Sequence, residues 1–221
     1  MNSTRQREHV TQQTVINDFR SDLLSWAYDN LRAFLWRETT DPYEILIAEI
    51  LLQKTEAEKV EPVYREFLST YPSLNELAAA DREELANIIY SLGLQNQRSK
   101  ALISIGETLQ GDGVPNDTNR LLELPYVGRY AANATLCFAF GEPRPIVDAN
   151  VVRVYNRIFD TDFDYRDEEA WEFAEKVLPE AYAWEFNLAI LDFAAAICRP
   201  KTPRCEECFF TDQCSYYRLR R

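Results

Sequence analysis

Four cysteines near the C-terminal end are the residues with the clearest capacity for chemistry. Cys198, Cys205, Cys208 and Cys214 form the pattern C-x6-C-x2-C-x5-C. The polar leading residues predict no export signal, and disulfides are disfavoured inside cells. Zinc sites usually pair two close cysteine units, whereas a [4Fe-4S] cluster takes one thiolate for each iron. The spacing therefore favours a [4Fe-4S] cluster over zinc, and we expect the cluster to fasten the C-terminal loop rather than transfer electrons.

Carboxylates are the next candidates, because the single histidine, His9, lies in the polar leader. Catalysis by a histidine base or a His triad is therefore excluded. Glu49 lies in the apolar run 43–55, which is typical of a buried helix. Asp148 stands at the predicted start of another helix, where it is either an N-cap or a functional carboxylate. Spacing alone leaves both interpretations open.

A tight turn with the residues Leu124-Pro125-Tyr126-Val127-Gly128 joins two further predicted helices. Backbone N–H groups at the start of the second helix, together with the helix dipole, suit a phosphate group. Such a turn can hold a DNA backbone without reading its sequence. An ordinary helix connection explains the pattern equally well.

The elements that must position these residues are predicted to be helices throughout. The 221 residues are 46% hydrophobic with only 6 Gly, which indicates a core-forming, all-α chain. Apolar residues recur at helical spacing over the ranges 12–36, 43–55, 58–70, 74–79, 82–91, 96–110, 167–178 and 183–198. The longest apolar stretch near the end is interrupted by Asp192, so we expect no membrane span and a cytoplasmic protein.

The charge distribution is uneven. The net charge of −12 would ordinarily argue against a nucleic-acid partner. However, residues 120–157 carry five Arg against three acidic residues, and residues 198–221 carry six basic residues against three acidic ones. These two basic islands could face a polyanion. The acidic, lysine-poor remainder suits either a high-salt habitat or an ordinary acidic protein.

Three motifs occur in a fixed order: the hairpin Leu124–Tyr130, the segment Val147-Asp148-Ala149-Asn150-Val151, and the four cysteines. Together they resemble the helix-hairpin-helix DNA glycosylases with an iron–sulfur cluster, the endonuclease III superfamily. The stretch from Asp41 through Thr55 is similar to the branch that holds adenine glycosylases and archaeal G·T mismatch thymine glycosylases.

The resemblance implies two helical domains with a C-terminal [4Fe-4S] loop at 198–214. One is a six-helix domain over 38–145, including the helix-hairpin-helix at about 121–136. The other combines 1–37 with 146–221. Double-stranded DNA with a mismatched base would lie across the groove between them, and the protein would act as a monomer associated with the nucleoid.

Tyr130 sorts the members of this family. Bifunctional members place a Lys after the hairpin, where this chain has Tyr130, so the resemblance implies no lyase activity. Adenine glycosylases typically have Ser there and a further C-terminal domain. The resemblance thus favours a monofunctional N-glycosylase that removes thymine or uracil opposite guanine. The alternatives are adenine excision from A·G or A·8-oxoguanine pairs, and a non-catalytic DNA-binding or redox-sensing iron–sulfur module.

The resemblance also implies roles for single residues. Asp148 would stabilise an oxocarbenium-like sugar, Glu49 would bond to or protonate the departing base, and Tyr130 would line the base pocket. Lys54 and Leu188 are the candidates for filling the gap in the duplex, with a surface Lys and a core Leu as the alternatives. The expected DNA contacts in the hairpin are Leu124, Pro125, Tyr126, Val127, Gly128 and Arg129.

One hairpin residue departs from the family pattern. The usual Leu-Pro-Gly-Val-Gly here has Tyr126 in place of the first Gly. We expect the turn to survive with a weaker or reoriented phosphate contact. Family hairpins also often hold a monovalent cation on backbone carbonyls, which here would be those of Leu122, Leu124 and Val127.

Overall fold

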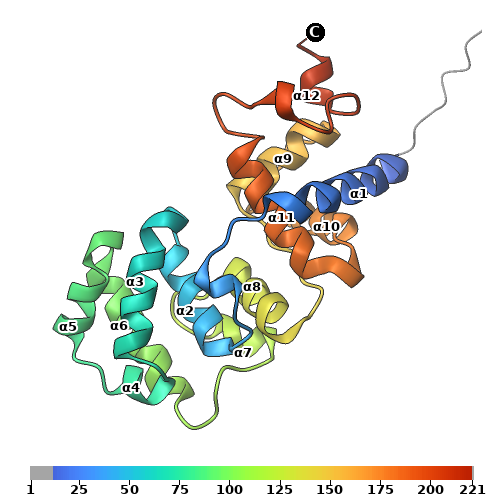
Figure 1. Cartoon of the computed structure of the whole chain (residues 1–221). Helices are drawn as coiled ribbons and strands as arrows, with labels where there is room; N and C mark the ends of the chain where they lie inside the picture. The colour runs from blue at the N-terminus through green and yellow to red at the C-terminus, as the bar shows by residue number, and fades with distance from the viewer. Residues whose placement is uncertain (1–11, 221) are drawn as a thin grey trace, which may run out of the picture. The chain divides into compact units, whose positions relative to one another are not determined.

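The computed structural model describes residues 12–220, and helices are the only regular secondary structure in that range. This confirms the all-α fold class. The chain divides into two compact units, residues 32–146 and the segments before Arg32 and after Ile146 (Figure 1). Within the described range no helix is long and apolar enough to cross a membrane. His9 lies outside the described residues.

The unit over 32–146 contains seven α-helices, one more than the six of the expected domain. It begins before residue 38, since Phe34 and Trp36 stack at 4.8 Å between ring centroids and belong to its core. Its elements are η1 (Leu35–Arg37), α2 (Pro42–Leu52), α3 (Ala57–Thr70), α4 (Leu74–Ala78), α5 (Arg82–Ile88), η2 (Tyr90–Leu92), α6 (Gln95–Leu109), α7 (Thr118–Leu122) and α8 (Arg129–Phe140).

Helix α2 runs through the core of this unit and positions Glu49. Asp41 caps it by accepting hydrogen bonds from the N–H groups of Tyr43 and Glu44, and Pro42 occupies the first helical position. The residues from Ile45 to Leu51 are all buried, which confirms the predicted buried helix. The helix ends earlier than the apolar pattern, because Lys54 adopts a left-handed backbone with φ of +57°.

The other unit is built around aromatic side chains. Its elements are α1 (Gln12–Asn30), α9 (Ala149–Phe159), α10 (Glu168–Val177), η3 (Glu180–Tyr182), α11 (Ala183–Ala196), η4 (Cys205–Glu207) and α12 (Ser215–Arg218). Phe19 of α1 is fully buried and meets Phe159, Phe186 and Phe210 edge-on at centroid distances of 5.4–6.1 Å. Phe210 lies between two of the cysteines, so these contacts anchor the cysteine-rich segment to α1.

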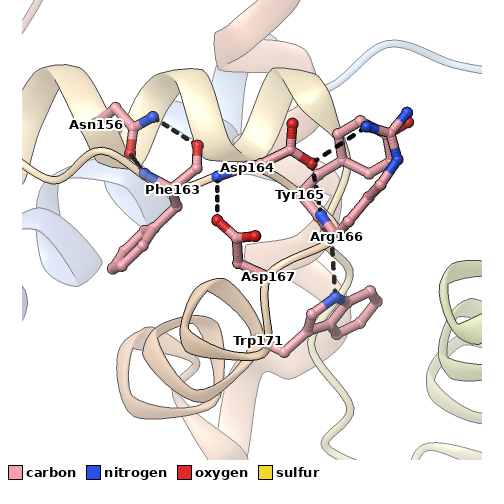
Figure 2. Close-up of polar contacts among 7 residues, drawn as sticks. All are labelled: Asn156, Phe163, Asp164, Tyr165, Arg166, Asp167 and Trp171. Atoms are coloured by element: carbon pink, nitrogen blue, oxygen red, sulfur yellow. Dashed lines mark hydrogen bonds and ion pairs between the residues drawn. The ribbon is translucent and has the colours of Figure 1, made fainter.

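The loop between α9 and α10 is held by the Asn156 carboxamide (Figure 2). Its Nδ2 donates to the Phe163 carbonyl at 3.0 Å, and its Oδ1 accepts from the Phe163 N–H at 3.0 Å. Further along, the Asp167 carboxylate accepts from the Asp164 N–H at 2.7 Å, and the Trp171 indole donates to the Tyr165 carbonyl. This closed loop fixes the C-terminal end of α9, whose N-terminal end carries Asp148.

Candidate active site

Asp148 is the N-cap of α9. Its Oδ1 accepts from the N–H groups of Asn150 and Val151, each at 2.8 Å, and its Oδ2 accepts from Asn150 Nδ2 at 2.7 Å. The side chain is half-buried. The capping interpretation is therefore correct as geometry, and it also fixes the direction of the carboxylate. A capped and oriented carboxylate remains able to act on a bound ligand.

Two arginines of α9 join this helix to the cysteine segment. Arg153 donates to the carbonyls of Cys198 and Ala194 at 3.0 and 3.1 Å, and to Asn150 Oδ1 at 2.9 Å. Arg157 donates to the carbonyls of Arg199 and Pro200, both at 2.6 Å. Asn150 also bonds to Asp148, so a chain of hydrogen bonds runs from the cap of α9 to Cys198.

The four cysteines of the tail are free thiols. Cys198 and Cys214 are buried, Cys205 and Cys208 are half-buried, and they lie near enough to influence one another electrostatically. Two sulfurs accept N–H bonds at 3.4 Å, Cys198 from Arg157 and Cys208 from Phe210. Burial raises the pKa of the Cys208 thiol to about 11. In the described residues no three His, Cys, Asp or Glu side chains converge as ligands of one metal ion.

Glu49 is a buried carboxyl group, 6% exposed, on α2. Burial raises its pKa to about 8, and the nearby guanidinium of Arg37 only partly opposes this shift. The carboxyl group is therefore mainly protonated near neutral pH and can donate a hydrogen bond. Such perturbed groups are found preferentially at functional sites.

The helix-hairpin-helix consists of α7, the turn 123–128 and α8, which packs against α2 (Figure 1). Gly128 is the N-cap of α8 and has no side chain to accept from the first-turn N–H groups. Tyr130 follows in that first turn and is half-buried. Tyr126 adopts the left-handed φ of +66° that the family glycine would favour. The turn thus survives the substitution, as expected.

The hairpin is tied to the end of α2. The Gln53 side-chain amide donates to the Tyr126 carbonyl at 2.7 Å. Glu49, Lys54 and Tyr130 therefore belong to neighbouring parts of one unit, whereas Asp148 and Leu188 belong to the other. Leu188 is only 4% exposed within α11, so the structure does not support it as a residue that enters DNA.

Sequence reasoning passed over Gln53, Leu94 and Arg98. Leu94 is 46% exposed, precedes α6 and adopts a left-handed φ of +54°. The signal for it was available, because an apolar residue next to Gly93 in a turn is a place where strain is stored. Arg98 and Gln53 carried no such signal, since the bond from Arg98 to the Gln53 carbonyl and the bond from Gln53 to the Tyr126 carbonyl join residues far apart in the sequence.

The sequence profile described as HhH-GPD superfamily base excision DNA repair protein matches residues 47–180, more than half of the chain. The chain belongs to this superfamily. A thymine/uracil-DNA glycosylase of Methanothermobacter thermautotrophicus is 39% identical over 205 residues, which cover 90% of this chain and 93% of that protein. An adenine DNA glycosylase of Mycolicibacterium smegmatis is 34% identical over 85% of this chain and 66% of its own length.

A solved structure agrees with this HhH-GPD assignment. The structure of a thermostable thymine-DNA glycosylase matches with a TM-score of 0.89 at 38% identity, covering 93% of this chain and 97% of that one. The superfamily resemblance drawn from the three motifs is thereby confirmed. The matched range contains the hairpin and both candidate catalytic carboxylates, Glu49 and Asp148.

Proposed function

We propose that this HhH-GPD protein is a monofunctional DNA glycosylase that removes thymine or uracil mispaired with guanine by hydrolysing the N-glycosidic bond. The observation that carries this proposal is the likeness, over nearly the whole length of both chains, to a thymine/uracil-DNA glycosylase. Tyr130 supports it, because an aromatic hydroxyl after the hairpin cannot form the Schiff base that a lyase reaction needs.

In this proposal Asp148 stabilises the positive charge that develops on the sugar as the base departs. Electrostatic stabilisation of that kind requires an ionised group held in a fixed direction before the reaction begins. The three hydrogen bonds that Asp148 accepts hold its carboxylate in a fixed direction before any ligand binds. The same carboxylate would orient the attacking water.

Glu49 would act on the base. Its pKa of about 8 keeps a proton available near neutral pH, and thymine and uracil leave more easily when their oxygen or nitrogen accepts a hydrogen bond. Tyr130, one helix away on α8, would line the base pocket through its ring and hydroxyl.

The hairpin, Lys54 and Leu94 would contact the duplex. A side chain at Gly128 would meet nothing within 4 Å in the protein itself, so packing does not explain the glycine, whereas close approach of a phosphate does. A flipped base leaves a gap in the stack, and the exposed apolar Leu94 suits that gap better than the buried Leu188. A monovalent cation on the carbonyls of Leu122, Leu124 and Val127 remains part of the proposal.

A [4Fe-4S] cluster on Cys198, Cys205, Cys208 and Cys214 fits the donor set. Four free thiols lie in mutual electrostatic range, and cluster ligands surround four irons rather than converge on one ion. The N–H bonds to Cys198 and Cys208 are of the kind that stabilise ligating thiolates. When bound, the cluster would hold the loop that Arg153 and Arg157 join to α9.

Single-turnover base release from G·T, G·U, A·G and A·8-oxoguanine duplexes tests the proposal. We expect release from G·T and G·U only, and none of the strand cleavage that a lyase produces. Adenine release would move the protein to the adenine-excising branch, and no release from any duplex would indicate a DNA-binding module. Because the proposed substrate is chromosomal DNA, we propose that the protein is located with the nucleoid in the cytoplasm. We also propose that it acts as a monomer.

A further inference from the structure

Three of the non-glycine residues with a left-handed backbone lie in the unit over 32–146. Lys54 has φ of +57°, Leu94 of +54° and Tyr126 of +66°. They belong to three segments distant in sequence: the end of α2, the start of α6 and the hairpin. Left-handed conformations are unfavourable for residues with side chains and persist only where their surroundings enforce them. The left-handed backbone of each of these three residues must therefore be held by its surroundings.

Arg98 joins the first two of these segments. Its side chain is fully buried, with 0% exposed. One terminal nitrogen donates to the Gly93 carbonyl at 3.1 Å and to the Leu92 carbonyl at 3.4 Å. The other donates to the Gln53 carbonyl at 2.8 Å. The planar guanidinium thus fixes the peptide groups directly before Lys54 and directly before Leu94.

The hairpin is attached to the same two segments by side chains. Gln53 donates to the Tyr126 carbonyl at 2.7 Å, and the Tyr126 hydroxyl donates to Gln97 Oε1 at 2.8 Å. Gln97 and Arg98 are consecutive residues of α6. Each pair of segments is therefore connected by at least one hydrogen bond, and no single segment can shift without breaking one.

Burying the charged guanidinium of Arg98 costs free energy, and its hydrogen bonds offset that cost only in part. Its Nε is buried without a hydrogen-bond partner, and a buried charge without a carboxylate is unfavourable. Simple packing does not require a cation there, since an apolar side chain of the same length would fill the space. Rigid alignment of two strained segments does require a planar group with several donors.

We propose that Arg98, assisted by Tyr126, is a positioning residue that holds Lys54, Leu94 and the hairpin as one preorganised DNA-contacting surface. This inference rests on the proposed function, in which these segments contact the duplex. Because the three segments are already fixed relative to one another, DNA binding does not have to order them separately. Leu94 can therefore enter the gap while the hairpin binds phosphate, without the entropy loss of ordering separate loops.

The test measures how strongly the protein prefers a duplex with an abasic-site analogue opposite guanine over the intact duplex. Arg98→Lys keeps the charge, but its single terminal nitrogen cannot replace the two guanidinium nitrogens that bond to two different segments. We expect this preference to fall about tenfold, and to fall similarly in Leu94→Ala. In the double variant we expect little further loss, because Arg98 acts through the position of Leu94.

Arg20→Lys is the matched control. Arg20 also donates to three carbonyls, those of Val177, Lys176 and Leu178, but it belongs to the other unit and to no proposed contact. It should lower the melting temperature as Arg98→Lys does and leave the preference for the abasic analogue unchanged. Equal losses of that preference in both variants would show a general stability effect and overturn the inference.

A milder variant keeps the test decisive if Arg98→Lys does not fold. Tyr126→Phe removes only the hydroxyl bond to Gln97, and we expect a smaller loss of preference, about threefold, that is again absent in a Leu94→Ala background. Fully additive effects in either double variant would overturn the inference. Since binding needs no base release, non-additive losses in a protein that releases no thymine or uracil would overturn the proposed function alone.

Discussion

Glu49 and Asp148, the two carboxyl groups of the proposed reaction, belong to different units and lie in opposite surroundings. Glu49 is enclosed by apolar residues of α2 and its neighbours, so burial raises its pKa to about 8. Asp148 is half-buried at the N-terminus of α9, where two backbone N–H groups and an amide donate to it.

This difference shows how the same kind of side chain, a carboxyl group, can serve either as a hydrogen-bond donor or as an anion. A carboxyl group in an apolar site keeps its proton and serves as a donor, and one surrounded by donors serves as an anion. The local environment decides between the two roles: Glu49 lies in the middle of a buried helix, and Asp148 lies at a half-buried helix start. The predictions below separate these two roles.

The largest effect is expected for Asp148→Asn. Loss of the negative charge should reduce single-turnover excision by on the order of 10³-fold, because the sugar cation loses its stabilising anion. The melting temperature should change little, since Asn caps a helix as well as Asp does and only the bond from Asn150 Nδ2 is lost. Asp81→Asn, which alters the N-cap of α5 in the same way, should change neither quantity. Wild-type rates in Asp148→Asn would show that the residue is only a cap.

The next effect is expected for Glu49→Leu. Removal of the buried donor should reduce excision by on the order of 10²-fold while preserving binding to an abasic analogue, because no base is present there to receive the hydrogen bond. Thermal stability should stay equal or rise, since a buried polar group is replaced by an apolar one. If binding to the abasic analogue falls as much as excision does, Glu49 supports the structure rather than the chemistry.

A smaller effect is expected for Arg153→Lys. Lysine cannot keep all the bonds to Cys198, Ala194 and Asn150, so α9 should lose roughly 1–3 kcal/mol of stabilisation and excision should fall less than tenfold. The pH dependence expected from Glu49 should stay unchanged, because the charge that acts on Glu49 is that of Arg37, and Arg153 bonds to Cys198, Ala194 and Asn150. A shifted pH profile in this variant would contradict the separation of the two roles.

The fold was largely predictable from the sequence. Apolar spacing located α2, α3, α5, α6, α10 and α11 to within a few residues, because these helices bury a clear face or are buried all round. The positions where helices end were harder to predict. The apolar pattern of α2 continues to Thr55, but the helix stops at Leu52, because Lys54 takes a left-handed backbone and the Gln53 carbonyl before it accepts from Arg98.

The site was predictable to the extent that motifs carry it. Asp148, Glu49 and the hairpin stand where local sequence placed them, as a helix cap, a buried carboxyl and a tight turn. Leu188 and Leu94 show the limit. Gly93 in the sequence marks the turn that exposes Leu94, whereas only the packing of α11 reveals that Leu188 is a core residue.

The most direct test of the two-carboxyl account is the pH dependence of single-turnover thymine release from a G·T duplex. The active form of Glu49 is the protonated one, so the wild-type rate should be constant below its pKa of about 8 and fall as pH rises through it. In Glu49→Gln, whose amide stays a neutral donor, the rate should be lower but flat across that range. A parallel decline of both proteins above pH 8 would contradict the account.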